Sequence, residues 1–277
     1  MKKNVLIFPC GSEIGLEVNR ALADSTYFTL FGANSVDDHG KFVYKNYIAR
    51  LPFIDASDFI DELNKAVEQY SIDFIIPAHD SAVLKMAENE QIIKATVVSS
   101  CLETCQICRS KRRTYEIFEK LILTPHVYTF TNKMKFPVFL KPDVGQGSKG
   151  TYKANTIEEV AFYIKKDPSL LILEYLPGKE YTIDCFTDRN GKLLFSAGRE
   201  RIRIYNGISV NSKPVSDARF QEIAEIINKQ LSIQGAWFYQ TKERSNGDLV
   251  LMEIAPRVAG TMALFRADGI NFAQLSL

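Results

Sequence analysis

Strand-like and helix-like segments alternate over the first hundred residues, and this alternation constrains the fold more than any other feature. Short apolar runs predict strands and a 3.6-residue apolar spacing predicts helices, in the order 5–9, 13–23, 27–32, 59–70 and 72–77. Strands separated by helices form parallel sheets, because each helix returns the chain to its starting edge. The sequence therefore predicts a Rossmann-like parallel sheet over residues 1–100.

The turn after the first strand does not carry the dinucleotide-binding pattern. Gly11 and Gly15 follow that strand, but Pro9 replaces the leading glycine of G-x-G-x-x-G. We favour a tight strand-to-helix turn here. Polar residues at the carboxyl ends of predicted strands are candidates for substrate binding, namely Ser12, Glu13, His79 and Asp80. For His79, a structural hydrogen bond is favoured over a role as a base.

After Thr124 the pattern shifts to antiparallel strands with occasional helices. A capping box at 156–159 begins a helix that ends near Lys166, and apolar spacing over 216–231 predicts a helix that covers a sheet. The fold class is therefore mixed, with an α/β part followed by an α+β part.

A glycine-rich loop follows an apolar run in the segment PVFLKPDVGQGSKG, residues 137–150. Lys141 ends the apolar run, and the loop then brings together small residues and a second cation, namely Gly145, Gly147, Ser148 and Lys149. Small residues let backbone N–H groups approach anionic oxygens, and lysines add positive charge, so the segment predicts a phosphate-binding loop. An ordinary β-turn with surface lysines is the alternative.

A second polar constellation lies about a hundred residues further on. WFYQTKERSNGDLVLMEIAPR reads as two strands joined by a turn at 245–248. The two-residue period lets Gln240 and Glu253 face the same cleft across these strands. Glu253 lies among apolar neighbours, where a carboxylate needs a cation, so we expect a hard metal such as Mg²⁺. Arg257 follows within reach of a phosphate or a substrate carboxylate.

Three arginines alternate on a predicted strand, at Arg199, Arg201 and Arg203. The two-residue period places them on one face, where they form surface ion pairs or receive phosphate. Arg203 is our candidate for contacting a transferred phosphoryl group.

Composition excludes several classes of protein. A net charge of +1 over 277 residues gives no broad basic field for nucleic acid, and no apolar stretch reaches the length that spans a membrane. Five cysteines fit a reducing cytoplasm better than a disulfide framework. Cys101, Cys105 and Cys108 have a spacing that resembles an iron–sulfur motif of radical enzymes, but they also share one helix face, and we favour core packing.

Together these residues resemble the ATP-grasp superfamily, close to the carbamoyl-phosphate synthase large subunit and related carboxylate–amine ligases. The resemblance implies that Lys141 and the loop 144–150 bind ATP phosphates, helped by Lys111 from ICRSKRRTYEIF, with Arg112 as its alternative. It implies that LILEYLPGKEYTIDCF is the hinge, where Glu174 accepts from the adenine amino group, the backbone of Tyr175 and Leu176 faces the ring, and Glu180 binds the ribose. Gln240 and Glu253 match the family's metal ligands.

The family ending Glu-x-Asn-Pro-Arg differs here, because Ala255 stands at the asparagine position. Ala255 has no ligand atom, so we expect one of two Mg²⁺ sites to be weakened. One or two Mg²⁺ ions are implied, with Mn²⁺ as a substitute.

The resemblance also implies a domain division and a reaction. Residues 1–100 would form a pre-ATP-grasp domain, 101–173 the lobe with the phosphate loop, and 174–277 the lobe with the metal site. The implied reaction joins a small-molecule carboxylate to an amine or thiol through an acyl phosphate, with Arg257, Lys141 and Arg203 in catalysis. The alternatives are a non-catalytic ATP-binding protein and a single unit that phosphorylates bicarbonate or carbamate. A homodimer is one option for assembly, and truncation at Leu277 is one interpretation of the chain's end.

Overall fold

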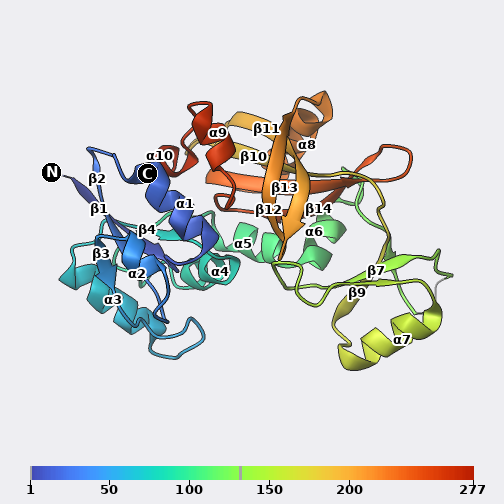
Figure 1. Cartoon of the computed structure of the whole chain (residues 1–277), viewed down its shortest axis with the longest axis horizontal. Helices are drawn as coiled ribbons and strands as arrows, with labels where there is room; N and C mark the ends of the chain where they lie inside the picture. Colours follow the sequence, from blue (N-terminus) through green and yellow to red (C-terminus); the bar gives the residue numbers. More distant parts are fainter. Residues whose placement is uncertain (1, 131–132) are drawn as a thin grey trace.

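A computed structural model describes residues 2–130 and 133–277, in which three sheets are arranged along the long axis (Figure 1). The first sheet is parallel, with the strand order β3-β2-β1-β4-β5. Its strands are β1 (Lys3–Phe8), β2 (Phe28–Ala33), β3 (Asn46–Ile48), β4 (Phe74–Pro77) and β5 (Thr96–Val97). The helices along this part are α1 (Glu13–Leu22), α2 (Gly40–Val43), α3 (Phe59–Gln69) and α4 (Asp80–Glu88). The predicted parallel sheet is confirmed.

Alternate residues of β1 enter two different cores. Leu6 and Phe8 pack with Phe59 and Leu63 of α3, whereas Val5 and Ile7 pack in a second core with α1. Each of these β1 side chains is at most 2% exposed. A strand that is buried on both faces needs an unbroken apolar sequence, and VLIF supplies it.

A pair of helices leads to a second, antiparallel sheet. The helices are α5 (Leu102–Arg109) and α6 (Lys111–Phe118). The strands, in the order β6-β9-β7-β8, are β6 (Val127–Tyr128), β9 (Leu170–Glu174), β7 (Val138–Pro142) and β8 (Tyr152–Ala154). Helix α7 (Ile157–Lys166) covers it, and its N-cap Thr156 accepts from the backbone of Glu159, as the predicted cap requires.

The third sheet is antiparallel, in the order β12-β11-β10-β13-β14. Its strands are β10 (Glu180–Thr187), β11 (Leu193–Tyr205), β12 (Ile208–Val215), β13 (Gly235–Glu243) and β14 (Leu249–Ala255). Helix α8 (Ala218–Gln230) packs against it through Phe220, Ile223 and Ile227, which confirms the predicted covering helix.

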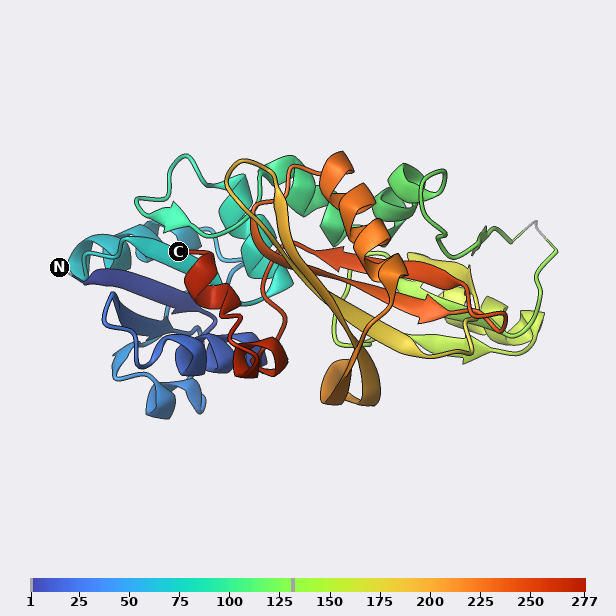
Figure 2. The ribbon, with the colours of Figure 1, turned by 90° about the horizontal axis from the view of Figure 1, so that it is seen from above.

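The end of the chain returns to the first sheet. Helices α9 (Ala263–Ala267) and α10 (Phe272–Leu275) lie beside α1 in both views (Figures 1 and 2). Phe265 and Phe272 share one core with Val5 and Ile7. The core of the parallel sheet is therefore completed by residues that come from the far end of the sequence.

The cysteine cluster is divided between core and surface. Cys105 packs with Val83 and Ala87, Cys108 lies in the core under the third sheet, and Cys101 precedes α5 and is exposed. Burial raises the pKa of Cys105 to about 11, which favours the thiol over the metal-binding thiolate. Core packing is thus confirmed for Cys105 and Cys108, and the expectation was wrong for Cys101.

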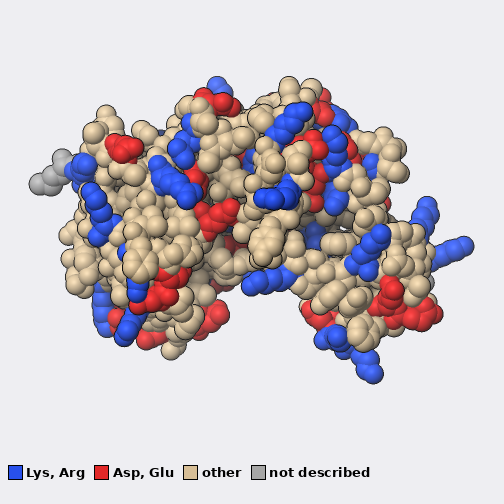
Figure 3. Space-filling model, in the orientation of Figure 1, with Lys and Arg blue, Asp and Glu red and all other residues tan. Residues whose placement is uncertain are grey.

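Positive and negative side chains are interspersed over the face seen in Figure 3, and that face is hollowed between its two ends. In the described part of the chain, no helix combines the length and apolar character needed to cross a bilayer.

Candidate functional site

Two adjoining cavities lie where the three sheets meet. The sheet cavity, about 170 Å³, lies between the second and third sheets and is bordered by Phe139, Tyr175 and Met252. The junction cavity, about 270 Å³, lies between the first sheet, the glycine-rich loop and the third sheet. Residues that line both cavities are Lys111, Gly145, Gln146, Gly147, Arg201, Gly207, Gln240 and Glu253.

The sheet cavity gathers the residues that the sequence assigned to nucleotide and metal. These are Lys111, Lys141, Gly145, Gly147, Ser148, Lys149, Glu174, Tyr175, Leu176, Glu180, Gln240 and Glu253. They come from α6, from strands of two sheets and from two connecting segments. The structure therefore brings them together, while their individual roles remain predictions.

Two buried lysines lie side by side at the sheet cavity. Lys141, the penultimate residue of β7, has 6% of its surface exposed, and Lys111 begins α6 with 8% exposed. The Lys141 ammonium donates to the carbonyl of Met252 at 3.3 Å, and the Lys111 ammonium donates to the carbonyls of Asp143 and Gly145. Burial, and then the charge of Lys111, lower the pKa of Lys141 to about 7. A polyanion in this cavity would stabilise both charges.

The acids of the predicted hinge are held by cations. Glu174 pairs with Arg244 at 2.6 Å, and Glu180 pairs with Arg201 at 3.0 Å and Lys242 at 3.4 Å. The carboxylate of Glu174 is therefore engaged by Arg244 beside the cavity. Lys242 lines the same cavity, and sequence reasoning missed it. The two-residue period from Gln240 would have found it.

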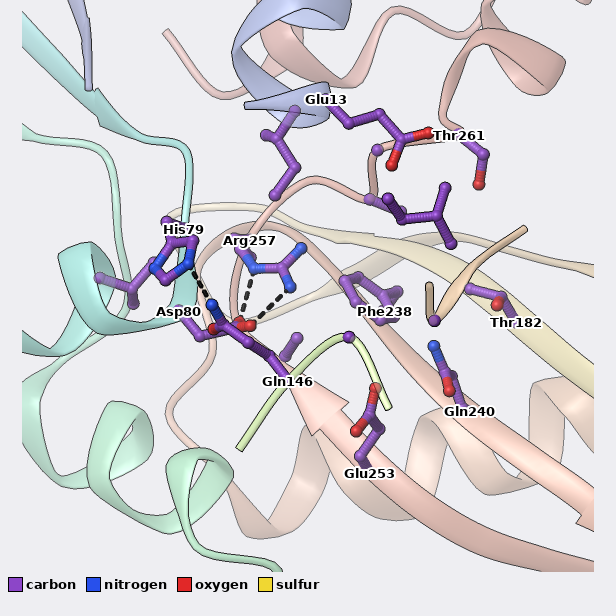
Figure 4. Close-up of a pocket in the computed structure, with 18 of the residues that line it drawn as sticks. Glu13, His79, Asp80, Gln146, Thr182, Phe238, Gln240, Glu253, Arg257 and Thr261 are labelled. Carbon is purple, nitrogen blue, oxygen red and sulfur yellow. Dashed lines mark hydrogen bonds and ion pairs between the residues drawn. The ribbon is translucent and has the colours of Figure 1, made fainter. Parts of the chain in front are cut away.

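Gln240 and Glu253 are direct partners across β13 and β14. The register shifts immediately after this pair, so Met252 is an extra residue on β14 and its carbonyl reaches Lys141. Both side chains enter the junction cavity (Figure 4). Residues 2–130 and 133–277 contain no group of three or more His, Cys, Asp or Glu that could hold a metal ion by itself. Any cation bound by this pair would need further oxygen ligands from another molecule.

The glycine-rich loop is fastened over both cavities. Its Gly145 carbonyl accepts from Arg109 at 3.3 Å as well as from Lys111, and Gln146 contacts His79. Gly207, in the turn between β11 and β12, approaches Gly147 so closely that a Cβ at Gly207 would come within 2.5 Å of the Gly147 backbone. The loop thus connects the parallel sheet with the third sheet.

Arg257 is held rigidly in the junction cavity. Its Nε and Nη2 donate to the two carboxylate oxygens of Asp80 at 2.6 and 2.8 Å, and its guanidinium lies over the ring of Phe238 (Figure 4). Burial alone would raise the pKa of Asp80, but Arg257 holds that pKa below its usual value. Asp80, a predicted substrate residue, therefore orients Arg257.

The structure corrects the prediction that Arg203 contacts a transferred phosphoryl group. Arg199 and Arg201 line the junction cavity, whereas Arg203 is exposed and lines neither cavity. A register shift between Arg201 and Arg203 interrupts the two-residue alternation, so the three arginines do not share one face. Arg201 occupies the boundary between the cavities, and its Nε is buried without a hydrogen-bond partner among the described residues.

The remaining predicted substrate residues also reach the junction cavity. Ser12 caps α1 by accepting from the backbone of Gly15, and His79 caps α4 by accepting from that of Ser81, as a structural role requires. Burial lowers the pKa of His79 and raises that of Glu13. The hydroxyl of Ser12 and the Nδ1 of His79 are thus engaged, whereas the carboxylate of Glu13 points into the cavity (Figure 4).

Comparison with known proteins supplies a family likeness for part of the sequence. A family model described as "ATP-grasp in the biosynthetic pathway with Ter operon" matches residues 166–277. The carbamoyl phosphate synthase large chain of Thermoanaerobacter sp. (strain X514) is 26% identical over 162 residues, which cover 52% of this chain and 15% of the relative. The match thus covers only about one seventh of that curated relative.

Solved structures resemble the whole chain. The biotin carboxylase domain of the Hydrogenobacter thermophilus 2-oxoglutarate carboxylase, solved as a dimer with MgADP, ADP and bicarbonate, has a TM-score of 0.81 at 14% identity, covering 100% of this chain and 69% of that one. An L-amino acid ligase from Bacillus licheniformis has a TM-score of 0.75 at 16% identity, covering 100% of this chain and 73% of that one. At these identities the likeness shows the fold.

Proposed function

We propose that the chain is an ATP-grasp protein on the branch of the carbamoyl phosphate synthase large chain, and that it acts as an ATP- and Mg²⁺-dependent ligase. The proposed reaction joins a small-molecule carboxylate to an amine through an acyl phosphate. One observation carries the proposal: Gln240 and Glu253 line both cavities at the point where they meet. Phosphate from one cavity and an acceptor from the other can therefore reach the same cation.

Charge and backbone donors favour ATP in the sheet cavity. Its phosphates would lie against Lys111, Lys141 and the glycine-rich loop, and its adenine against Tyr175 and Leu176. A triphosphate would also remove the repulsion between the two buried lysines. This pairing of buried cations with a polyanion offsets the cost of their burial.

Gln240 and Glu253, which we call the metal pair, fit Mg²⁺. Its two side chains offer hard oxygen ligands, and Mg²⁺ is commonly bound by one or two such groups together with substrate phosphates. When bound, Mg²⁺ would neutralise charge on the transferred phosphoryl group. Ala255 offers no further ligand at the end of β14.

Catalysis requires mainly alignment and charge neutralisation. A carboxylate oxygen of the substrate attacks the γ-phosphorus, the bond to the β–γ bridging oxygen breaks, and ADP leaves with that electron pair. Arg257, fixed by Asp80, would steady the acyl phosphate from the junction cavity. The amine then attacks the acyl carbon and loses a proton, and inorganic phosphate leaves.

The test is ADP release from Mg·ATP with a panel of carboxylates and amines, bicarbonate included. We expect release with at least one acid, and a loss of about 100-fold or more in both Lys141→Ala and Glu253→Ala. Asp248→Asn, in the exposed turn of the same hairpin, is the control and should retain full activity. Wild-type turnover in either site variant would contradict the assigned roles.

Ala255 is the observation that favours a second candidate function, namely regulation by bound ATP without turnover. Nucleotide binding by the wild type without ADP release from any acid, bicarbonate included, would support this alternative.

A homodimer is the proposed assembly, supported by the biotin carboxylase domain that was solved as a dimer. A sedimentation mass near 31.4 kDa, that of one chain, would contradict it.

A further inference from the structure

Most charges of the junction cavity are already paired within the protein. Arg199 pairs with Asp184 at 2.7 Å, Arg201 with Glu180 at 3.0 Å, and Arg257 with Asp80 at 2.6 Å. Each pair is close to neutral, so these arginines add little net positive charge to the cavity, although Arg257 can still donate to the acyl phosphate. The charges that remain lie at two separate places.

The first place is the boundary with the sheet cavity, where Lys111, Arg109 and Glu253 lie close to the glycine-rich loop. The proposed function uses Lys111 and Glu253 through ATP and Mg²⁺, and Arg109 already donates to the Gly145 carbonyl and the Ser81 hydroxyl. The second place is Glu13, the first residue of α1, across the cavity from Gln240 and Glu253 (Figure 4). The proposed function leaves this carboxylate unused.

No residue in the described ranges forms a hydrogen bond or ion pair with the Glu13 carboxylate, which is half-buried. Its desolvation is only partly offset by Arg199, Arg201 and Arg257, which already have carboxylate partners. Gly260 confines it on one side, because a Cβ there would come within 2.8 Å of Oε2. A half-buried carboxylate that points into open space is costly unless a cation pairs with it, and none of the side chains that the structure describes supplies that cation here.

The size of the cavity indicates more than a minimal substrate. One water molecule needs roughly 10–15 Å³ of cavity volume, and the junction cavity has about 270 Å³. Bicarbonate or ammonia would fill a small part of it. The space fits an organic molecule of several heavy atoms with groups at both ends.

The group that Glu13 would hold is not the nucleophile. An amine must be uncharged to attack an acyl phosphate, whereas a carboxylate favours the protonated form. Glu13 also lies across the cavity from the metal pair, away from the phosphoryl group. Its cation is therefore a recognition group on the molecule that becomes phosphorylated.

We propose that the acid substrate is an amino-bearing carboxylic acid, whose ammonium group binds Glu13 while its carboxylate faces Gln240 and Glu253. This inference rests on the proposed ligase function and adds the substrate class. It places recognition of the amino group on the first helix and phosphoryl transfer on the third sheet.

The experiment uses hydroxylamine, which traps an acyl phosphate as a hydroxamate without a second substrate. The wild type is given Mg·ATP and matched pairs of acids with and without an amino group: alanine or β-alanine against propionate, and 4-aminobutyrate against butyrate. We expect at least one amino-bearing acid to be preferred by roughly 10- to 100-fold in kcat/KM, the range of a hydrogen bond to a charged group.

Glu13→Gln should abolish most of this preference, and Gly260→Ala should reduce it by displacing the carboxylate without removing its charge. A general loss of activity cancels in the ratio between paired acids, so the readout is specific. Equal use of both members by the wild type, preference for the deamino acid, or an unchanged ratio in both variants would overturn the inference while leaving the ligase function standing. If the wild type forms neither hydroxamate nor ADP with any acid, the proposed function fails, and the inference with it.

Discussion

At the scale of the residue, burial determines how the charges of the site behave. A lysine in a short peptide is a solvated cation, but burial and the charge of Lys111 lower the pKa of Lys141 to about 7. The side chain is therefore mostly neutral at pH 8 before a ligand arrives. Phosphate oxygens would stabilise the charged form and raise the pKa again.

We expect nucleotide binding at pH 8 to take up protons, because Lys141 becomes charged as phosphates enter. Calorimetric titrations in two buffers of different ionisation enthalpy measure this uptake. It should disappear in Lys141→Met and persist in Lys149→Met, whose lysine is exposed in the loop. Equal uptake in the wild type and Lys141→Met would assign the proton to another group.

The Asp80–Arg257 pair should contribute measurably to stability. Asp80→Asn leaves a half-buried guanidinium without its carboxylate, and we expect the free energy of unfolding at pH 7 to fall by about 2–3 kcal/mol, less than for a fully buried pair. The control Asp37→Asn breaks the exposed pair with Lys41 and should cost less than about 1 kcal/mol.

The pH dependence of this difference follows from the lowered pKa of Asp80. A carboxylate with a lowered folded-state pKa stabilises the protein above its unfolded-state pKa, about 3.9, and loses that effect as the pH falls through the folded value. Urea unfolding should therefore show the same difference at pH 7 and pH 6 and a smaller one below about pH 4. A difference that grows in acid would contradict the ion-pair explanation.

At the scale of the element, the glycine-rich loop depends on a turn from another sheet. Gly207 has φ +76° and lies against the backbone of Gly147, so it supplies both a left-handed conformation and a close approach. Gly247, in the turn of the β13–β14 hairpin, has φ +84° and open space around it. Both glycines have a left-handed backbone conformation, but only Gly207 lies against another segment of the chain.

Gly207→Ala should release the loop, whereas Gly247→Ala should only strain its turn. We expect both variants to lose about 1 kcal/mol of stability from the left-handed conformation. Only Gly207→Ala should show several-fold faster tryptic cleavage after Lys149, together with weaker nucleotide binding. Equal cleavage in the two variants would show that the contact does not hold the loop.

At the scale of the whole molecule, the last helices connect the ends of the chain. Phe272 is 2% exposed in the core that it shares with β1 and α1, whereas Leu275 on the same helix is 52% exposed. Phe272→Ala should lower the free energy of unfolding by about 3–5 kcal/mol, and Leu275→Ala by less than about 1 kcal/mol.

Hydrogen exchange should detect where that loss is felt. We expect faster exchange in α1 and β1 of Phe272→Ala, although the substitution is some 250 residues away in sequence. Faster exchange confined to α10 would show that the last helices do not support the parallel sheet.

Local patterns determined a large part of this protein. The period of apolar residues predicted the strands and helices, because one face of each must be buried whatever its partner. The family-like motifs predicted a cavity lined by Lys111, Lys141, the glycine-rich loop and the Gln240–Glu253 pair. These residues lie in short segments, and the residue types and their spacing within each segment already indicate what it can bind.

Only the tertiary structure decided the rest, because it depends on distant partners. Arg203 was displaced by a bulge that arises from the register with β12, and Asp80 became the partner of Arg257 although 177 residues separate them. Likewise, only the folded structure places Gly260 beside Glu13 and pairs Arg199 and Arg257 with other carboxylates, which leaves the Glu13 carboxylate unpaired in the ranges that the structure describes. Sequence specifies which side chains are able to ionise, whereas folding decides which of them remain unpaired.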